Sequence, residues 1–344
     1  MKRLLMIISI VLFLIIDPII LYVYNFGYNN IPNNLNTPQE PQEEPAKDFP
    51  NIPLSLRSEF KTDWSKINPK IEKAISGGPS KDGIPAINSP IFDPIKESNL
   101  DDNIEAIVLD DNGIKKIYPY NILVWHEIVN DTVNGIPVSI TLSPLSGTAI
   151  VFNRKVDNKE LVFGVTGHLL ENNMIMYDTE TESLWQQSTK KALAGEYLDK
   201  ELYLVPFQLL KIGQIKKSYP KALILSQNTG FDRDYTKNPY ADYENNDNFK
   251  FPVSVANKIF PPKKIFTVFK IDKKTVVVPW LELEEDIVYE NIIDKQTIFI
   301  KRKNGELSIT NKKNGIIPFY FEMWFSIYVQ NPENLIVLDP KEVN

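Results

Sequence analysis

The residues best suited to chemistry gather around one of the chain's two histidines. His126 is followed directly by Glu127, and Asp131 lies a few positions further on. Imidazole and carboxylate side chains can act together as general acid and base, or they can bind a metal ion. The sequence therefore gives His126 as a candidate general base or metal ligand, with Glu127, Asp131 and the more distant Asp178 as candidate catalytic carboxylates.

These residues also have structural interpretations. Neighbouring side chains on a strand point to opposite faces, so His126 and Glu127 would not form a pair there. His126 would then be a buried, hydrogen-bonded histidine at a helix–strand junction. Asp131 precedes a hairpin turn, where it would bond backbone amides, and Asp178 would cap a turn toward Thr181. An acid–base site, in contrast, requires His126 and a carboxylate within hydrogen-bond reach.

A second set of polar and aromatic side chains could line a ligand groove. The hydroxyl residues belong to the segment SPLSGT, and His168 lies in a turn flanked by glycines, which let the backbone approach a ligand closely. Ser146 could be a nucleophile beside His126 and Asp131, but the G-x-S-x-G pattern is absent, and bonding to loop backbone is the simpler role. The candidate ligand-binding residues are Trp125, Ser143, Ser146, Thr148, His168, Tyr177 and Trp185.

Composition excludes several kinds of chemistry. The chain has no cysteine, so disulfides, thiolate catalysis and thiolate-ligated metals are excluded. The formal net charge is −6 and no dense run of lysine and arginine occurs, whereas a nucleic-acid-binding surface is usually basic. We therefore expect no nucleic-acid partner, and no motif identifies a cofactor.

The first residues predict a membrane anchor. Leu4 to Tyr24 are 21 residues, close to the roughly 20 that cross a hydrocarbon core. Asp17 within them costs about 2.5–3.5 kcal/mol on the insertion scale, and about fifteen apolar residues that each return about 0.3–0.6 kcal/mol outweigh it. We expect a transmembrane signal-anchor helix over residues 1–25, with 4–24 in the lipid bilayer.

Charge predicts the orientation of this anchor. Lys2 and Arg3 precede the helix, and no further lysine or arginine occurs before Lys47. The positive-inside rule then predicts a single-pass protein with a cytoplasmic N-terminus and the body outside the cell membrane. The alternative is a cleaved signal peptide with its core at 4–16. We favour the anchor because no alanine occurs before Ala46, so the small-residue pattern of a cleavage site is missing.

The chain beyond the anchor divides by composition. Residues 26–58 are rich in Pro, Asn and Glu and poor in aliphatics, which predicts a disordered linker. Beyond it, short β-rich runs alternate with turn signals such as Asp-Asp-Asn-Gly and Asn134-Gly135. Helices are expected over 119–125 and 207–218. The predicted fold class is mainly β with minor α, an α+β arrangement.

The end of the chain resembles a shortened copy of the middle. Pro119 falls on Pro279, displaced by 160 residues (279 − 119), whereas Pro220 falls on Pro332, displaced by 112 (332 − 220). The second copy thus lacks about 48 residues, which correspond roughly to 143–197 of the first. All the unusual polar residues of the first copy fall in or just before this stretch.

This repeat predicts two related antiparallel β units that pack as a pseudo-duplicate. The first unit would span 59–255 and carry the candidate site, and the second, shortened unit would span 256–344 and act as scaffold. Chance similarity between two β-rich segments is the alternative explanation.

Five segments in the body resemble one known family. In order between Asp82 and Glu244 they are DGIPAI, YPYNILVWHEIVNDTVNGIPVSIT, SPLSGTAIVFNR, FGVTGHLLENNMIMYDTETESLWQQ and NTGFDRDYTKNPYADYE. They resemble the uncharacterised domain-of-unknown-function family 3179 of bacteria and archaea, and the resemblance extends to about Leu338. It implies no known reaction. The family typically has C-P-L-C-G-T where this chain has SPLSGT, so any family chemistry that needs the two sulfurs is lost or changed here.

Two functions follow from these observations. The first is a membrane-tethered, non-catalytic module that binds a ligand or partner protein through a degenerate site, and a pocket formed by Trp125, Ser146 and Tyr177 would support it. The second is a metal-dependent or acid/base enzyme that uses His126 with nearby carboxylates. The second fails if His126 is sealed in the core against a backbone carbonyl.

Overall fold

The computed structural model describes residues 51–255, 257–331 and 333–340. The predicted transmembrane helix and most of the predicted linker lie outside these residues, so both remain predictions. Within the described part, no helix combines the length and apolar character needed to cross a membrane. Short strands dominate this part and its helices have at most seven residues, which confirms the predicted fold class of mainly β with minor α.

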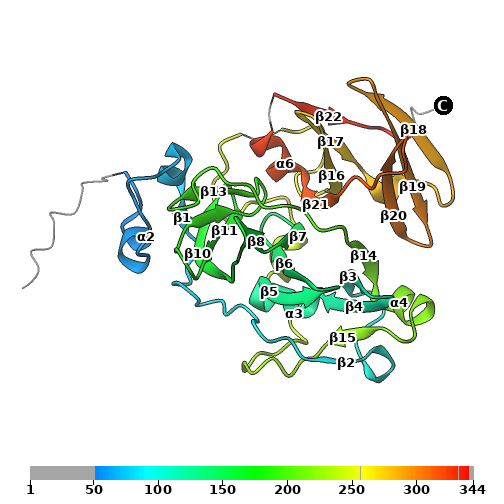
Figure 1. Cartoon of the computed structure of the whole chain (residues 1–344), viewed down its shortest axis with the longest axis horizontal. Helices are drawn as coiled ribbons and strands as arrows, with labels where there is room; N and C mark the ends of the chain where they lie inside the picture. The colour runs from blue at the N-terminus through cyan, green and yellow to red at the C-terminus, as the bar shows by residue number, and fades with distance from the viewer. Residues whose placement is uncertain (1–50, 256, 332, 341–344) are drawn as a thin grey trace, which may run out of the picture. The chain divides into compact units, whose positions relative to one another are not determined.

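One five-stranded sheet has the order β14-β3-β4-β15-β2 (Figure 1). Its hairpin β3–β4 turns at Asn112-Gly113, where both residues have positive φ, as a tight hairpin turn requires. The hairpin predicted here is therefore confirmed. Helix α3 follows β4 directly, with Pro119 as its N-cap. The bounds are β2 Phe92–Pro94, β3 Glu105–Asp111, β4 Ile114–Pro119, α3 Tyr120–His126, β14 Gln208–Lys211 and β15 Leu223–Leu225.

The segment 207–218, predicted as one helix, is a helix only in its second half. Gln208–Lys211 form β14, which pairs with β3, and Ile212–Ser218 form helix α4. The apolar spacing of the segment fits a helix, but the pairing of its first half with a strand far away in the sequence overrides that local preference. The prediction was therefore wrong for 208–211.

A seven-stranded sheet has the order β22-β17-β16-β21-β7-β6-β5. The turn of its β5–β6 hairpin is Asn134-Gly135, with φ of 52° and 72°, as the sequence predicts. β21 pairs with β7, so this sheet combines strands from both predicted β units (Figure 1). The bounds are β5 Ile128–Val133, β6 Ile136–Ser143, β7 Thr148–Asn153, β16 Ile265–Ile271, β17 Lys274–Val278, β21 Phe319–Met323 and β22 Leu335–Val337.

The remaining strands form a second five-stranded sheet, β1-β10-β11-β12-β13, a three-stranded sheet, β18-β19-β20, and the pair β8-β9. Their bounds are β1 Ile75–Ser76, β8 Lys155–Val156, β9 Lys159–Glu160, β10 Phe163–Leu170, β11 Asn173–Asp178, β12 Leu184–Gln186, β13 Lys191–Ala194, β18 Val288–Ile293, β19 Gln296–Lys303 and β20 Glu306–Asn311. The other helices are α2 Leu54–Glu59, η1 Pro69–Lys73, η2 Ile95–Glu97, α5 Ala241–Glu244, η3 Trp280–Glu282 and α6 Trp324–Gln330.

Two four-stranded arrangements in the body share one plan. The order β14-β3-β4-β15 recurs as β21-β16-β17-β22, with antiparallel, antiparallel and parallel neighbours in both. Ile107 pairs with Tyr118 in the first, and Thr267 pairs with Val278 in the second, 160 positions later. Helix α6 begins at Trp324, 112 positions after the start of α4 at Ile212.

The three strands β5-β6-β7 correspond in the same way to β18-β19-β20. Ile128 pairs with Thr141, and Val288 pairs with Lys301 at a displacement of 160. β7 has a positional counterpart in β20, and the missing stretch predicted at roughly 143–197 remains a prediction. That stretch contains β8 to β13.

Buried apolar side chains form one large core and two smaller clusters. Helix α2 belongs to one of the smaller clusters, where Leu56 is fully buried together with Ile52 and Phe60. Residues 51–58, which the sequence assigns to a disordered linker, are therefore folded where the structure describes them. The buried side chains of Ile52, Leu56 and Phe60 recur at helical spacing, which is enough to dock one short helix.

Candidate functional site

His126 is sealed in the core at the end of α3. Its Nδ1 lies 2.7 Å from the carbonyl oxygen of Pro85 and its Nε2 lies 2.6 Å from the hydroxyl of Tyr235. A carbonyl only accepts, so Nδ1 carries the proton and Nε2 accepts the Tyr235 O–H. Burial lowers the pKa of His126, which keeps the ring neutral. This is the buried structural histidine that the sequence offered as an alternative, and neither ring nitrogen reaches a carboxylate.

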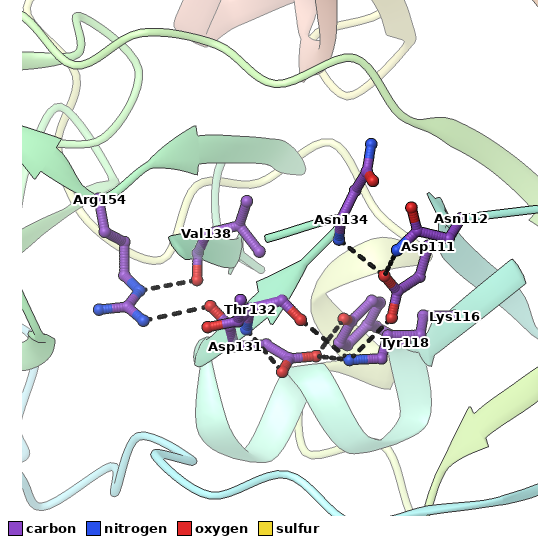
Figure 2. Close-up of polar contacts among 9 residues, drawn as sticks. All are labelled: Asp111, Asn112, Lys116, Tyr118, Asp131, Thr132, Asn134, Val138 and Arg154. Carbon is purple, nitrogen blue, oxygen red and sulfur yellow. Dashed lines mark hydrogen bonds and ion pairs between the residues drawn. The ribbon is translucent and has the colours of Figure 1, made fainter. Parts of the chain in front are cut away.

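Asp131 joins the β5–β6 hairpin to β4 (Figure 2). Its Oδ2 accepts hydrogen bonds from Lys116 Nζ at 3.0 Å and from the Tyr118 hydroxyl at 2.6 Å. Lys116 also lies 3.5 Å from Asp111, and Arg154 donates to the Asp131 backbone carbonyl at 3.1 Å. Asp131 Oδ1 accepts the backbone N–H of Thr132 at 2.7 Å, as predicted, and the other contacts of Asp131 in Figure 2 link strands, so its geometry is that of a structural ion pair.

Asp178 and Trp185 form one structural unit at the turn after β11. The carboxylate accepts the backbone N–H of Thr181 at 2.7 Å, as the predicted turn cap would. It also accepts Trp185 Nε1–H at 3.0 Å, and the Trp185 side chain is fully buried. Neither residue lines one of the described cavities.

Tyr177 and Trp125, the other two aromatic candidates, lie in separate places. The Tyr177 hydroxyl donates to Asp82 Oδ2 at 2.5 Å, and the Tyr177 ring packs edge-on against Phe60. Trp125 Nε1 donates to the backbone carbonyl of Lys237 at 3.0 Å. Trp125, Ser146 and Tyr177 therefore do not form a single pocket.

Ser143, Ser146 and Thr148 enter a buried network of hydrogen bonds. Ser143 Oγ accepts the backbone N–H of Met174 at 3.1 Å. Ser146 Oγ lies 2.7 Å from Thr148 Oγ1 and accepts Asn173 Nδ2–H at 3.1 Å. All three hydroxyl residues are at most 1% exposed. Ser143 and Ser146 are thus closed to solvent and bonded internally.

This network includes Gln187, which directly follows β12. Gln187 Oε1 accepts Asn173 Nδ2–H at 2.9 Å, and Gln187 Nε2 donates to Thr141 Oγ1 at 2.8 Å and to the Thr148 carbonyl at 3.0 Å. A satisfied buried amide of this kind fixes the relative position of the strands it links. The Gln187 side chain therefore orients the chain segment that follows it, which includes residues 188–190.

Glu322 is the acidic member of the network and was missed in the sequence. One carboxylate oxygen accepts Ser326 Oγ–H at 2.6 Å and Thr148 Oγ1–H at 3.3 Å, while the other has no partner within the described residues. Burial raises the pKa of Glu322 to about 7, against the lowering effect of the Ser326 hydrogen bond. The sequence feature that could have indicated its burial is its position as the one acid in the aromatic run PFYFEMWF.

Lys190 is the basic group nearest to this network and was also missed. It precedes β13 with φ of 64°, and it is only 4% exposed. Its Nζ lies 3.7 Å from Glu201 and 5.4 Å from the Tyr320 ring centroid. Burial, followed by repulsion from Lys270, lowers the pKa of Lys190 to about 8. The side chain is therefore a desolvated cation with one ion pair, to Glu201, and a further electrostatic attraction to Glu322.

Lys190 lines a cavity of about 250 Å³, which we call the Lys190 pocket. Gln186, Ser188 and Gln330 also line it, and each has one side-chain atom that is buried without a partner within the described residues: Gln186 Nε2, Ser188 Oγ and Gln330 Nε2. Thr189 Oγ1 lies 3.1 Å from Gln186 Oε1 and so fixes that amide. An adjoining cleft of about 550 Å³ shares Lys190, Lys270 and Tyr320 with it. The remaining lining residues of the Lys190 pocket are Asn68, Lys70, Thr189, Lys191, Leu193, Asp199 and Asn331.

A second cavity, of about 200 Å³, brings together the candidates Glu127 and His168, and we call it the Glu127 pocket. Glu127 is 6% exposed and accepts one long hydrogen bond, 3.4 Å, from the Tyr240 hydroxyl. Burial raises the pKa of Glu127 to about 8. His168 Nδ1 donates to the Thr166 carbonyl at 3.1 Å, and its Nε2 accepts from Ser55 Oγ at 2.7 Å.

Within the described residues, no group of three or more His, Asp or Glu side chains is arranged to hold a metal ion. The candidate site therefore consists of two cavities in a β-rich body. One is lined by a desolvated lysine and the other by a desolvated carboxyl group.

The sequence places this body in a family. A family model described as "Protein of unknown function (DUF3179)" matches residues 81–319, more than half of the chain, and the chain belongs to that family.

The matched range contains Lys190, Glu127 and the SPLSGT segment, whereas Glu322 and Gln330 lie beyond its end. Comparisons with curated proteins and with solved structures gave no match. The function must accordingly be argued from the geometry of the two cavities.

Proposed function

We propose that the protein is a membrane-tethered module that displays its body outside the cell and binds a small oxyanion, such as a carboxylate or phosphate group, in the Lys190 pocket. The observation that carries this proposal is the buried Lys190 ammonium beside the unpartnered Gln186, Ser188 and Gln330 side chains. A buried charge is costly unless it is paired and hydrogen-bonded. A bound oxyanion would provide that pairing.

The carboxylate nearest to Lys190 leaves it under-compensated. Glu201 lies 3.7 Å from Lys190 Nζ and 4.0 Å from Lys270 Nζ, so one acid is shared between two lysines. Glu201 is also 41% exposed on its side chain, where water weakens its field. The pKa of about 8 still leaves Lys190 mostly protonated at pH 7, so it can pair with an anion.

The polar atoms around Lys190 suit an oxyanion, which accepts several hydrogen bonds at once. Gln186 and Ser188 are at most 3% exposed, so their unpartnered atoms cannot be satisfied by bulk water. Unsatisfied buried polar atoms cost about 1–3 kcal/mol each, and a ligand recovers that energy when these occluded side chains turn toward the cavity to bond it. The charge around the two adjoining cavities is also positive, with lysines at 70, 155, 190, 191, 200 and 270 against acids at 157, 199 and 201.

The closed SPLSGT segment supports binding rather than sulfur chemistry. The Ser143 and Ser146 hydroxyls are bonded internally and face no cavity. The alternative enzyme centred on His126 has less support, because both of its ring nitrogens are occupied by Pro85 and Tyr235. We therefore propose that the ligand binds at Lys190, and that the SPLSGT segment with its two serines is the degenerate part of the site.

We also propose that the body arose by duplication, with 256–344 as a shortened copy of the first unit. Support comes from the equal strand orders and the pairing registers displaced by 160 residues. The second unit is then more than scaffold, because Lys270, Tyr320 and Gln330 line the Lys190 pocket. The proposed binding site would thus lie where the two units meet in the shared sheet.

Isothermal titration of the full chain in lipid nanodiscs tests the binding function. The titrants are inorganic phosphate and succinate, with a neutral diol of similar size as the control ligand. We expect Lys190→Met to weaken binding of at least one anion by 10-fold or more. Lys96→Met removes the same charge from an exposed position outside the cavities and should leave binding unchanged. Equal loss in both variants, or no anion binding by the natural chain, refutes the proposal.

The tether is tested separately by protease accessibility. In spheroplasts, an added protease should digest the body, and deletion of residues 4–24 should release it from the membrane fraction. A body that is digested only after lysis would contradict the proposed orientation.

A further inference from the structure

Glu127 is held at a conformationally costly position. It is the C-cap of α3 and has φ of 57°, a region that glycine adopts without cost and that costs other residues about 1–2 kcal/mol. Its backbone N–H bonds the Leu123 carbonyl at 2.7 Å, and its carbonyl accepts the Leu142 N–H at 2.8 Å. These two bonds fix the backbone, and the side chain lines the Glu127 pocket. A turn alone would be better served by glycine.

The carboxyl group of Glu127 is under-bonded for a buried acid. Its one hydrogen bond within the described residues is the 3.4 Å contact from Tyr240, although a carboxylate can accept about four. Oε2 has no hydrogen bond within the described residues and is not among the fully occluded atoms, and the residue lines the cavity. A ligand with N–H donors would use the remaining acceptor capacity.

The walls of the Glu127 pocket are otherwise mostly apolar. The ring of Tyr240 and a set of aliphatic side chains surround the carboxyl group, and both ring nitrogens of His168 are already bonded. Lys250 is an exposed residue on the lining, and its Nζ lies 5.8 Å from the Tyr240 ring centroid. The aliphatic and proline lining residues are Pro79, Ile84, Leu145, Val165, Leu169, Met174 and Pro239.

We propose that the Glu127 pocket binds a small alkylammonium ion. The Glu127 carboxylate would accept the ammonium N–H donors, the aliphatic walls would take the alkyl chain, and the Tyr240 ring would face the cation. The volume of about 200 Å³ lies below the roughly 300–1,000 Å³ of drug-sized pockets, so the ligand is small. This site differs from the Lys190 pocket in its residues and in the sign of its ligand, and it stands whether or not that pocket binds anions.

The charge of Glu127 must change when such a cation binds. Burial holds its pKa at about 8, so the empty pocket contains a protonated acid at pH 7. A bound ammonium favours the carboxylate, so binding should release a proton. The other titratable groups on the pocket lining are His168, Tyr240 and Lys250.

The test compares n-butylammonium with 1-butanol and butyrate by isothermal titration of the full chain in nanodiscs. We expect the natural chain to bind n-butylammonium at least 10-fold more tightly than 1-butanol, and to bind butyrate least. Titration at pH 7 in two buffers of different ionisation enthalpy should show release of close to one proton. Equal affinity for the amine and the alcohol overturns the proposal without any variant.

Two variants locate the site. Glu127→Gln keeps the side-chain volume and should weaken n-butylammonium binding by 10-fold or more. Glu72→Gln, at an exposed position outside the cavities, is the matched control and should bind as the natural chain does. Lys250→Met removes the neighbouring cation and should tighten binding severalfold. Retention of full affinity in Glu127→Gln, or weaker binding in Lys250→Met, would contradict the assignment.

Discussion

Replacing Lys190 by methionine should stabilise the protein while weakening anion binding. Methionine keeps the length and most of the volume of the side chain and removes only the charge. The lysine is 4% exposed, and its nearest carboxylate is 3.7 Å away and shared with Lys270. Groups that bind ligands are often held at a cost in stability, and an isosteric apolar substitution then stabilises the fold.

The magnitude follows from the pKa of Lys190. The fall from its ordinary 10.5 to about 8 corresponds to about 3 kcal/mol at about 1.4 kcal/mol per pKa unit. This is the free energy by which the folded protein disfavours the ammonium, after the attraction of Glu201 and Glu322 is included. We expect Lys190→Met to raise the free energy of unfolding at pH 7 by about 1–3 kcal/mol, the lower end allowing for imperfect packing of methionine.

The pH dependence has a defined sign. Between about pH 8 and 10.5, unfolded Lys190 keeps its proton while the folded side chain releases it, so the natural chain becomes more stable relative to Lys190→Met as pH rises. The assay is thermal unfolding followed by near-UV circular dichroism, at pH 7 and pH 10, with Lys96→Met as control. A variant less stable than the natural chain at pH 7, or a stability difference independent of pH, would refute the reasoning.

Three further outcomes follow from the described contacts. In Glu127→Gln, the difference in unfolding free energy from the natural chain should vary with pH, because folded Glu127 keeps its proton up to about pH 8 while the unfolded acid loses it near 4.5. Measured by chemical denaturation, the natural chain should lose up to about 5 kcal/mol of stability relative to the variant as pH rises across that window. A difference that does not change with pH would exclude a buried acid. Asp131→Ala should destabilise by about 1–3 kcal/mol in the same assay, because Lys116 and Tyr118 lose their shared acceptor, and Lys116→Ala in the Asp131→Ala background should then cost little more. A cysteine introduced at Ser146, which is fully buried, should react with Ellman's reagent at least 100-fold more slowly than one placed at the exposed Lys96; comparable rates would show that the SPLSGT segment is open.

Local signals predicted the parts of the fold that local chemistry decides. Asn112-Gly113 and Asn134-Gly135 adopt positive φ at hairpin turns, and both hairpins were predicted from these residues. Pro119 marks the start of α3 for the same reason, since its fixed φ suits the beginning of a helix. The strand β14 was missed because its pairing with β3 joins residues about a hundred positions apart.

The candidate site was harder to predict, because both cavities assemble residues from distant segments. Lys190 meets Tyr320 and Gln330 only through the sheet that joins the two units, and nothing near Lys190 in the sequence indicates its burial. Glu322 left a faint signal as one acid among aromatic residues. His126 is of a residue type that often acts in catalysis, and only the contacts of its two ring nitrogens show that its role is structural.

The most direct measurement for the central claim is anomalous X-ray diffraction from crystals of the body soaked in sodium selenate. Selenate is an oxyanion whose selenium is located without reference to the protein density. The account predicts a selenium peak in the Lys190 pocket, with selenate oxygens within hydrogen-bond distance of Lys190 Nζ and of at least one atom among Gln186 Nε2, Ser188 Oγ and Gln330 Nε2. Peaks confined to exposed lysines, with the Lys190 pocket holding only water, would contradict it.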